Sequence, residues 1–307
     1  MRIDTRKGNL DNISRTVYYQ NYYRKNKEVS WAYLASMVSR NAGWSMTDLF
    51  SKPFCTLLPK EKRHHLFITY ERANWFIFSD AFPQLKIYEL SKKVGEPLFH
   101  LMEEFDVSQW MIHEWSIFWE TGDLTRLLHA LIVNEQHLIQ EPVIESPFFY
   151  KKVFHELDYV LQEKMHFSAV LLPTIKGKLY GISIKNFLDV NGRIELGKKL
   201  GWILLESPEK KQINAFFENQ AHTGSRKDYQ LWQKGLFPHT PPLRLVYPYV
   251  YHEDNKREDW SQIKRYKPNK SLSKAWNPPK KYDLSYWYRK KQLQISVAAG
   301  LKGLLIP

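Results

Sequence analysis

Apolar side chains recur at a spacing near 3.6 residues through most of the first 221 residues, and no other feature constrains the fold as strongly. Over residues 13–41 the pattern is that of a helix with one buried face, and Gly43 is suited to end it. The same pattern predicts further helices over residues 60–80, 83–93, 97–120, 122–140, 147–167, 191–205 and 208–221. We therefore expect a mainly α, multi-helix globular body of roughly eight to ten helices.

One segment of this body departs from the helical period. Residues 171–184 contain Gly177 and Gly181 among alternating apolar side chains. They form either a small hairpin or an irregular excursion.

The composition changes at Phe237. Seven of the 16 prolines lie in residues 238–291, together with many tyrosine, tryptophan and basic residues. Proline opposes helix formation, whereas so many aromatic side chains indicate that the segment lies against another surface. The sequence thus predicts three parts: a helical body (1–236), an extended basic arm packed on it (237–283), and a C-terminal helix (284–307) that Asp283 caps.

The aromatic content compensates for a modest aliphatic content. The chain has 17 Phe, 18 Tyr and 11 Trp, and each such side chain buries a large area in a core. The single cysteine, Cys55, excludes an intrachain disulfide and a cysteine-rich metal site. Because no apolar run resembles a secretory signal or a membrane span, we expect a cytoplasmic protein.

Charge is distributed unevenly along the chain. Residues 1–29 hold 7 basic and 3 acidic side chains, and residues 244–291 hold 13 and 5, whereas residues 30–243 are neutral. Basic ends on a neutral body favour an anionic partner bound at the termini. Nucleic acid is the first such partner to consider, and a peripheral membrane surface is a weaker alternative.

The arm carries the residues that such a partner would contact. Basic groups track a phosphate backbone and aromatic rings stack on bases, and here the two kinds alternate. The alternative is a solvated basic strap whose aromatic side chains dock on the body. The candidate residues are Arg257, Trp260, Lys264, Arg265, Tyr266, Lys267, Lys270, Lys274 and Trp276.

A second set of polar residues lies in the body. In the segment 222–228, Ser225 and Asp228 suit a capping box for a short helix, but Thr223, Ser225, Arg226 and Asp228 also suit a site for a phosphate or carboxylate. Charged residues in apolar helices form either an internal salt-bridge network or a lined pocket. In the pocket reading, an enzyme or small-ligand site would contain Arg40, Asn41, Glu71, Arg72, His222 and Arg226.

Within that pocket, Glu71 or His222 would be the catalytic acid or base, and Arg40 and Arg226 would bind an anion. Two Glu-x-x-His pairs, at Glu61–His64 and Glu163–His166, are too weak a pattern to predict a metal site. We therefore predict neither a metal nor another cofactor.

Four motifs resemble those of a known family. They are Ser39-Arg-Asn-Ala-Gly-Trp44, Glu71-Arg-Ala-Asn74, Glu195-Leu-Gly-Lys198, and His222-Thr-Gly-Ser-Arg226 followed by Asp228. Together they are similar to the YppC-type proteins of Bacillus relatives, a domain of unknown function, over most of residues 10–265. The resemblance implies a cytosolic protein of Gram-positive origin and supplies no catalytic residue.

The sequence therefore leads to three hypotheses. The first is a protein that binds an anionic partner, with nucleic acid foremost, through its basic termini. The second is an enzyme or small-ligand binder that uses the polar pocket. The third is a structural or interaction protein, for which an exposed aromatic patch would be the sign.

Overall fold

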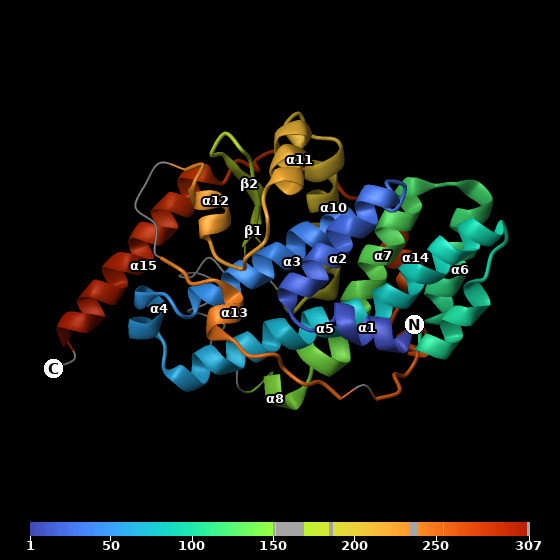
Figure 1. The fold of residues 1–307 in the computed structure, drawn as a ribbon, viewed down its shortest axis with the longest axis horizontal. Coiled ribbons are helices and arrows are strands. Elements are labelled where there is room, and N and C mark those ends of the chain that lie inside the picture. Colours follow the sequence, from blue (N-terminus) through green and yellow to red (C-terminus); the bar gives the residue numbers. More distant parts are fainter. Residues whose placement is uncertain (150, 152–168, 184–186, 234–238, 254, 306–307) are drawn as a thin grey trace.

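The fold is described from a computed structural model covering residues 1–149, 151, 169–183, 187–233, 239–253 and 255–305. Most of these residues are helical, so the expected mainly α fold is confirmed (Figure 1). The N-terminal part comprises α1 (Arg2–Gly8), α2 (Asn12–Lys25), α3 (Trp31–Asp48), α4 (Lys52–Leu57) and α5 (Lys60–Val94). The central part comprises the 3-10 helix η1 (Phe99–Phe105), α6 (Gln109–Thr121), α7 (Leu124–Leu138), the π-helical turn η2 (Gln140–Ile144) and α8 (Pro147–Phe149).

Beyond these lie a two-stranded hairpin and the C-terminal helices. The strands are β1 (Ala169–Pro173) and β2 (Leu179–Ser183), and α10 (Val190–Leu205), α11 (Lys210–Asn219) and α12 (Lys227–Gln230) follow. The last elements are α13 (Leu243–Val246), the 3-10 turn η5 (Trp260–Gln262), α14 (Pro268–Ser273) and α15 (Ser285–Leu305).

The largest hydrophobic cluster is aromatic, as the composition predicts. It takes buried rings from α2, α3, α5 and α6, and it extends to Trp260 and Tyr288 near the C-terminus. Trp31, Trp44 and Trp115 are among its largest fully buried side chains. Residues more than two hundred positions apart thus share one core.

Several helix boundaries differ from the expectation. The helix predicted over residues 13–41 is divided into α2 and α3, and the helix predicted over residues 97–120 is divided into η1 and α6. The helix predicted to end at Gly43 continues to Asp48, and the stretches 60–80 and 83–93 form the single helix α5, which runs through Pro83. Both positions are packed against other elements, so tertiary contacts outweigh the local preference. Of the helix predicted over 147–167, only Pro147–Phe149 and residue 151 lie within the described residues.

The segment that departs from the helical period is a hairpin. β1 and β2 pair in antiparallel register with Leu171 opposite Gly181. Gly181 has a φ of +146° and packs against the Val170 carbonyl, which leaves no room for a side chain. Its N–H donates to the Tyr282 carbonyl at 2.9 Å, so the end of the arm continues the hairpin edge.

We refer to residues 239–283 as the arm. It contains the short helices α13 and α14, so the prediction of a non-helical segment is wrong at these places. α14 packs against α7, and the Lys198 ammonium of α10 donates to the carbonyls of Ser271 and Leu272 at 3.0 and 2.9 Å. These contacts fix the position of α14 relative to the body.

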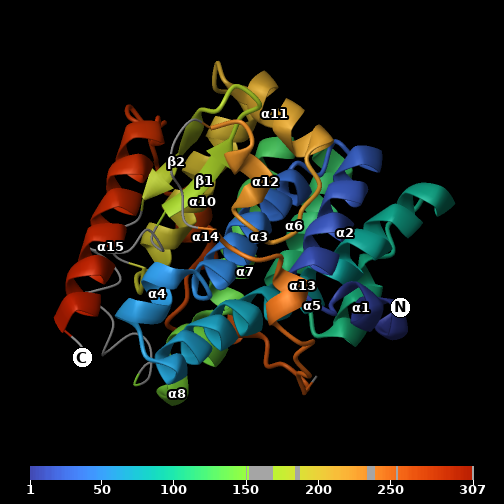
Figure 2. The same cartoon turned by 60° about the vertical axis from the view of Figure 1, so that its left-hand side comes forward.

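Helix α15 follows the arm and packs along α4 (Figure 2). The Asp283 carboxylate accepts a hydrogen bond from the Ser285 N–H at 2.9 Å at its start. Near its other end, the Lys302 ammonium donates to the Leu57 carbonyl at 3.0 Å. None of the helices in the described ranges is long and apolar enough to cross a lipid bilayer.

Candidate functional site

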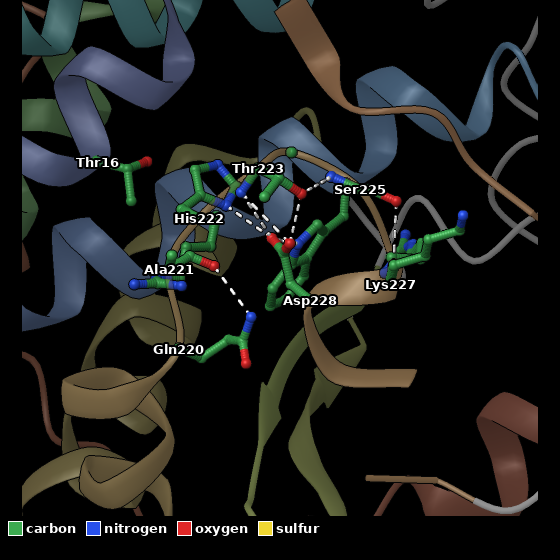
Figure 3. Close-up of polar contacts among 12 residues, drawn as sticks. Thr16, Gln220, Ala221, His222, Thr223, Ser225, Lys227 and Asp228 are labelled. Carbon is green, nitrogen blue, oxygen red and sulfur yellow. Dashed lines mark hydrogen bonds and ion pairs between the residues drawn. The ribbon is translucent and has the colours of Figure 1, made fainter. Parts of the chain in front are cut away.

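The Asp228 carboxylate is the centre of a buried polar network between α3 and the segment 222–229 (Figure 3). It accepts hydrogen bonds from the Trp44 indole at 2.9 Å, the Thr223 N–H at 3.1 Å and His222 Nδ1 at 3.2 Å. Burial raises the pKa of Asp228, but these hydrogen bonds outweigh it and hold the pKa below its usual value. Asp228 is therefore ionised and has its partners within the chain.

His222 is held on its other side by α2. Its Nε2 lies 2.8 Å from Asn12 Oδ1, and the Asn12 amide donates to the Ser39 carbonyl at 2.8 Å. The His222 side chain is fully buried. Its position suits the joining of α2 and α3 to the segment 222–229 better than proton exchange with a substrate.

The anion-binding position predicted at Arg226 is filled by the protein itself. The guanidinium holds the Asp48 carboxylate, with Nε–O distances of 3.1 and 3.0 Å and an Nη2–O distance of 2.6 Å. Its Nη1 donates to the Tyr229 hydroxyl at 3.0 Å. Burial lowers the pKa of Arg226, but Asp48 together with Tyr229 and Tyr288 raises it by more, so the guanidinium is charged. Ser225 is also engaged, because its hydroxyl donates to the Thr240 carbonyl at 2.7 Å.

Arg40 and Asn41 lie on α3, near the same polar network, but their side chains make different contacts. The Asn41 side chain bonds both backbone groups of Leu171, each at 2.7 Å, and so fastens β1 to α3. Arg40 is buried and contacts Gln20 Oε1 at 3.4 Å, while burial lowers its pKa to about 10. Its Nε and Nη1 have no hydrogen-bond partner among the described residues.

Glu71 and Arg72 lie in a separate cluster on α5. Glu71 forms an ion pair with Arg15 and lies 3.4 Å from His252 Nε2. Burial raises the pKa of Glu71, but Arg15 and His252 lower it by more. Arg72 contacts His252 Nδ1 at 3.2 Å and stacks over Phe76, with its guanidinium carbon 4.3 Å from the ring centroid.

The six residues proposed to share a pocket therefore fall into two clusters. Glu71 and Arg72 contact Arg15 and His252, whereas Arg40, Asn41, His222 and Arg226 lie around α3. Internal charge compensation explains the positions of Glu71 and Arg226, which pair with Arg15 and Asp48, because burying an unpaired charge is costly. Arg40 is the exception, because it contacts the neutral Gln20 side chain and forms no ion pair with another described residue. The interpretation as an internal salt-bridge network therefore has support for Glu71 and Arg226.

Open space lies instead between the arm and the end of α7. We call one cavity the lysine cleft; it has a volume of about 410 Å³ and is lined by His137, Val190, Asn191, Arg265, Tyr266, Lys267, Lys270, Ser271 and Lys274. A neighbouring cavity of about 400 Å³, the glutamate cleft, is lined by Arg72, Phe76, His137, Leu138, Glu141, Pro142, Glu253, Asn255, Lys256, Arg257, Glu258, Trp260 and Ile263. His137 borders both cavities.

The two clefts differ in charge. Arg265 is held by Glu141 and Glu145, with N–O distances of 2.7 and 2.6 Å. Lys267, Lys270 and Lys274 are exposed, and no ion pair joins them to another residue in the described part of the chain. The lysine cleft thus keeps a positive charge, whereas the three glutamates that line the glutamate cleft are matched there by Arg72, Lys256 and Arg257.

Some of the predicted arm residues face inward. Trp260 is only 6% exposed, and its indole N–H donates to Asn134 Oδ1 at 3.1 Å. Arg257 donates to the Phe105 carbonyl at 2.6 Å. Trp276 contacts the ring of His129, at a centroid distance of 5.9 Å, and Lys264 is exposed. Trp260 therefore cannot stack on bases in this conformation, because its ring completes the core.

The basic N-terminus does not join this surface. Figure 2 shows the N-terminus well apart from α14. In addition, Arg15 and Arg24 are paired with Glu71 and Glu218. No residue of the segment 1–29 lines the lysine cleft, so the positive charge of this cleft comes from the arm.

His137 is the residue that sequence reasoning missed. It lies among other histidines on helical faces, and nothing in its spacing distinguishes it. Only the path of the arm places it between two cavities.

As to metal sites, no three His, Cys, Asp or Glu side chains come together among the described residues, which exclude Glu163 and His166.

Comparison with known proteins places this chain in a family. Residues 7–289 match the family described as "Protein of unknown function (DUF2515)", and the chain belongs to that family. It is 43% identical over 293 residues to "Uncharacterized protein YppC" of Bacillus subtilis (strain 168), a match that covers 95% of this chain and 90% of the relative. The family resemblance expected from the sequence is thereby confirmed. No solved structure matches the chain.

Proposed function

We propose that this protein binds an anionic partner at the lysine cleft, and that the partner is a nucleic acid. The observation that carries the proposal is the convergence of Lys267, Lys270 and Lys274, exposed and without an ion pair to any described residue, on one cavity. When such lysines bind phosphates, the counterions condensed on the nucleic acid are released. This release favours binding at low salt.

The surroundings of the lysines support the same proposal. Tyr266 lines the cleft and is only partly buried, so one aromatic ring is available for contact with a base. The Lys198 ammonium holds α14 through backbone carbonyls, so the side chains of Lys270 in α14 and of the flanking Lys267 and Lys274 are not needed to hold this helix. The lysines are therefore presented by an ordered segment.

The test is a salt series with single-stranded and duplex DNA and RNA, followed by fluorescence anisotropy. In the triple variant K267A/K270A/K274A the slope of log K against log [salt] should fall by about 2 for a single strand, because each phosphate contact contributes about 0.7. A matched control, K7A/K25A/K211A, removes the same charge from exposed lysines on α1, α2 and α11. It should keep the wild-type slope.

Two results would contradict the proposal. One is equal binding by the cleft variant and the control variant, which would reduce the interaction to net charge. The other is binding to anionic lipid vesicles without binding to DNA or RNA at low salt, which would replace nucleic acid with a membrane surface.

A further inference from the structure

His137 is a buried imidazole without a hydrogen-bond partner. It lies in the last turn of α7, is 3% exposed, and stacks on Trp260 with a centroid distance of 4.7 Å and an interplanar angle of 9°. Neither Nδ1 nor Nε2 has a partner among the described residues. Buried polar groups are almost always hydrogen-bonded, so a cavity-lining exception points to a partner from outside the chain.

The chemistry of this imidazole restricts that partner. Burial and the neighbouring Arg193 lower the pKa of His137 to about 4, so the ring is neutral near pH 7. A neutral imidazole has one N–H donor and one acceptor nitrogen. Arg193 does not supply the partner, because it donates to Gln136 Oε1 at 2.9 Å and to the Phe187 carbonyl at 2.8 Å.

The rest of the cleft supplies complementary features. Tyr266 contacts the His137 ring at a centroid distance of 4.8 Å, and Lys267, Lys270 and Lys274 also line the cleft. The volume of about 410 Å³ lies at the lower end of the range for small-ligand sites, which suits one nucleotide and not several. A planar base with donor and acceptor groups on its edge would satisfy the imidazole.

We propose that the lysine cleft holds a single nucleotide, with its base against Tyr266 and His137 and its phosphate at Lys267, Lys270 and Lys274. This inference rests on the proposed function, because the same lysines supply the charge. The nucleotide is either a free nucleoside monophosphate or one residue of a bound strand.

The experiment compares His137→Phe with His129→Phe. Phenylalanine keeps a flat ring for Trp260 and removes both nitrogens of residue 137. His129 is a second histidine of α7; it contacts Trp276 and does not line the lysine cleft. Binding of AMP, CMP, GMP, UMP and ribose 5-phosphate is measured by calorimetry, and binding of RNA hexamers by anisotropy.

We expect the His137→Phe variant to bind at least one nucleotide about tenfold more weakly than the wild type does. The His129→Phe variant should bind that nucleotide with wild-type affinity. Ribose 5-phosphate, which lacks the base, should bind both variants like the wild type. If only the hexamers show the loss, the nucleotide belongs to a strand. If a mononucleotide shows it as well, the cleft takes free nucleotides.

Equal affinity of the wild type and His137→Phe for every nucleotide and hexamer would overturn the inference and leave the proposed function standing. Wild-type binding by the triple lysine variant would overturn both. Should His137→Phe fail to fold, nitrogen NMR of the wild-type histidine rings decides. The inference then requires the His137 signals to move with a nucleotide and to stay unmoved with ribose 5-phosphate.

Discussion

At the scale of single residues, Gly43 shows how closely the buried network is fitted. A Cβ at this position would lie 2.3 Å from Asn12 Oδ1 and 2.8 Å from His222 Nε2. These two atoms are joined by one hydrogen bond of 2.8 Å, so neither side chain can move aside without breaking it. The glycine expected to end a helix is instead a point of contact inside it.

Replacing this glycine therefore reverses a familiar rule. Alanine inside a helix is usually about 1 kcal/mol more favourable than glycine. We expect Gly43→Ala to lower the free energy of unfolding by about 2 kcal/mol through overpacking. Gly300→Ala, in α15 with nothing within 4 Å of the added Cβ, should instead raise it. Urea denaturation measures both, and a stabilised Gly43→Ala variant would show that the network yields easily.

Glu135 carries a pH dependence of stability. Burial raises the pKa of its carboxyl to about 7, while Trp31 donates to it at 3.0 Å. Between pH 4.5 and 7 the folded state keeps a proton that the unfolded state has released, so the free energy of unfolding decreases as pH rises through this window.

Glu135→Gln removes this titration. Its stability relative to the wild type should increase from pH 4.5 to 7 and then level off. His129 and His137, whose pKa values are lowered to about 4, act in the opposite direction but cancel in the comparison. Chemical denaturation across pH measures the difference, and a difference independent of pH would contradict the assignment.

At the scale of elements, the chain predicts helices better than their ends. The apolar period located α5, α7 and α10 because each buries one face, but Pro83 suggested a break in α5 that the buried flanks Phe82 and Leu85 prevent. The local sequence determines helix propensity, whereas the ends of these helices depend on tertiary contacts with neighbouring elements. Such neighbours come from distant parts of the chain.

Helix α15 is joined to the body by a chain of buried hydroxyls. Tyr229 accepts a hydrogen bond from Arg226 and donates to the Tyr288 hydroxyl at 2.8 Å. We expect Tyr288→Phe to cost about 1–3 kcal/mol, because the Tyr229 hydroxyl loses its acceptor in a buried site. Tyr286→Phe, at a position 73% exposed on the same helix, should cost almost nothing. Equal thermal stability of the two variants would show that this hydroxyl chain does not hold α15.

At the scale of the whole molecule, the candidate site was only partly predictable. The basic residues of the arm were evident from composition, as was their suitability for phosphate. Which of them face solvent was not evident, because Arg257 and Trp260 turn inward to Phe105 and Asn134. The orientation of these two side chains depends on partners more than one hundred residues away in the sequence. The local spacing of residues does not predict such contacts.

Because Trp260 and Tyr288 share the core cluster of the body, the arm and the body should unfold together. We expect coincident urea transitions by far-ultraviolet circular dichroism and by tryptophan fluorescence. An earlier fluorescence transition that disappears in a Trp260→Phe variant would show instead that the arm detaches before the body unfolds.

The hydrogen bond between Trp260 and Asn134 also has a consequence for folding during synthesis on the ribosome. Synthesis proceeds from the N-terminus, so the helices up to α7 emerge long before the segment that covers their aromatic surface. Until residue 260 leaves the exit tunnel, Trp110 and His137 lack the indole that packs on each of them. A nascent chain stalled before that point would expose this aromatic surface to chaperones. The C-terminal segment that contains Trp260 completes the core by covering that surface.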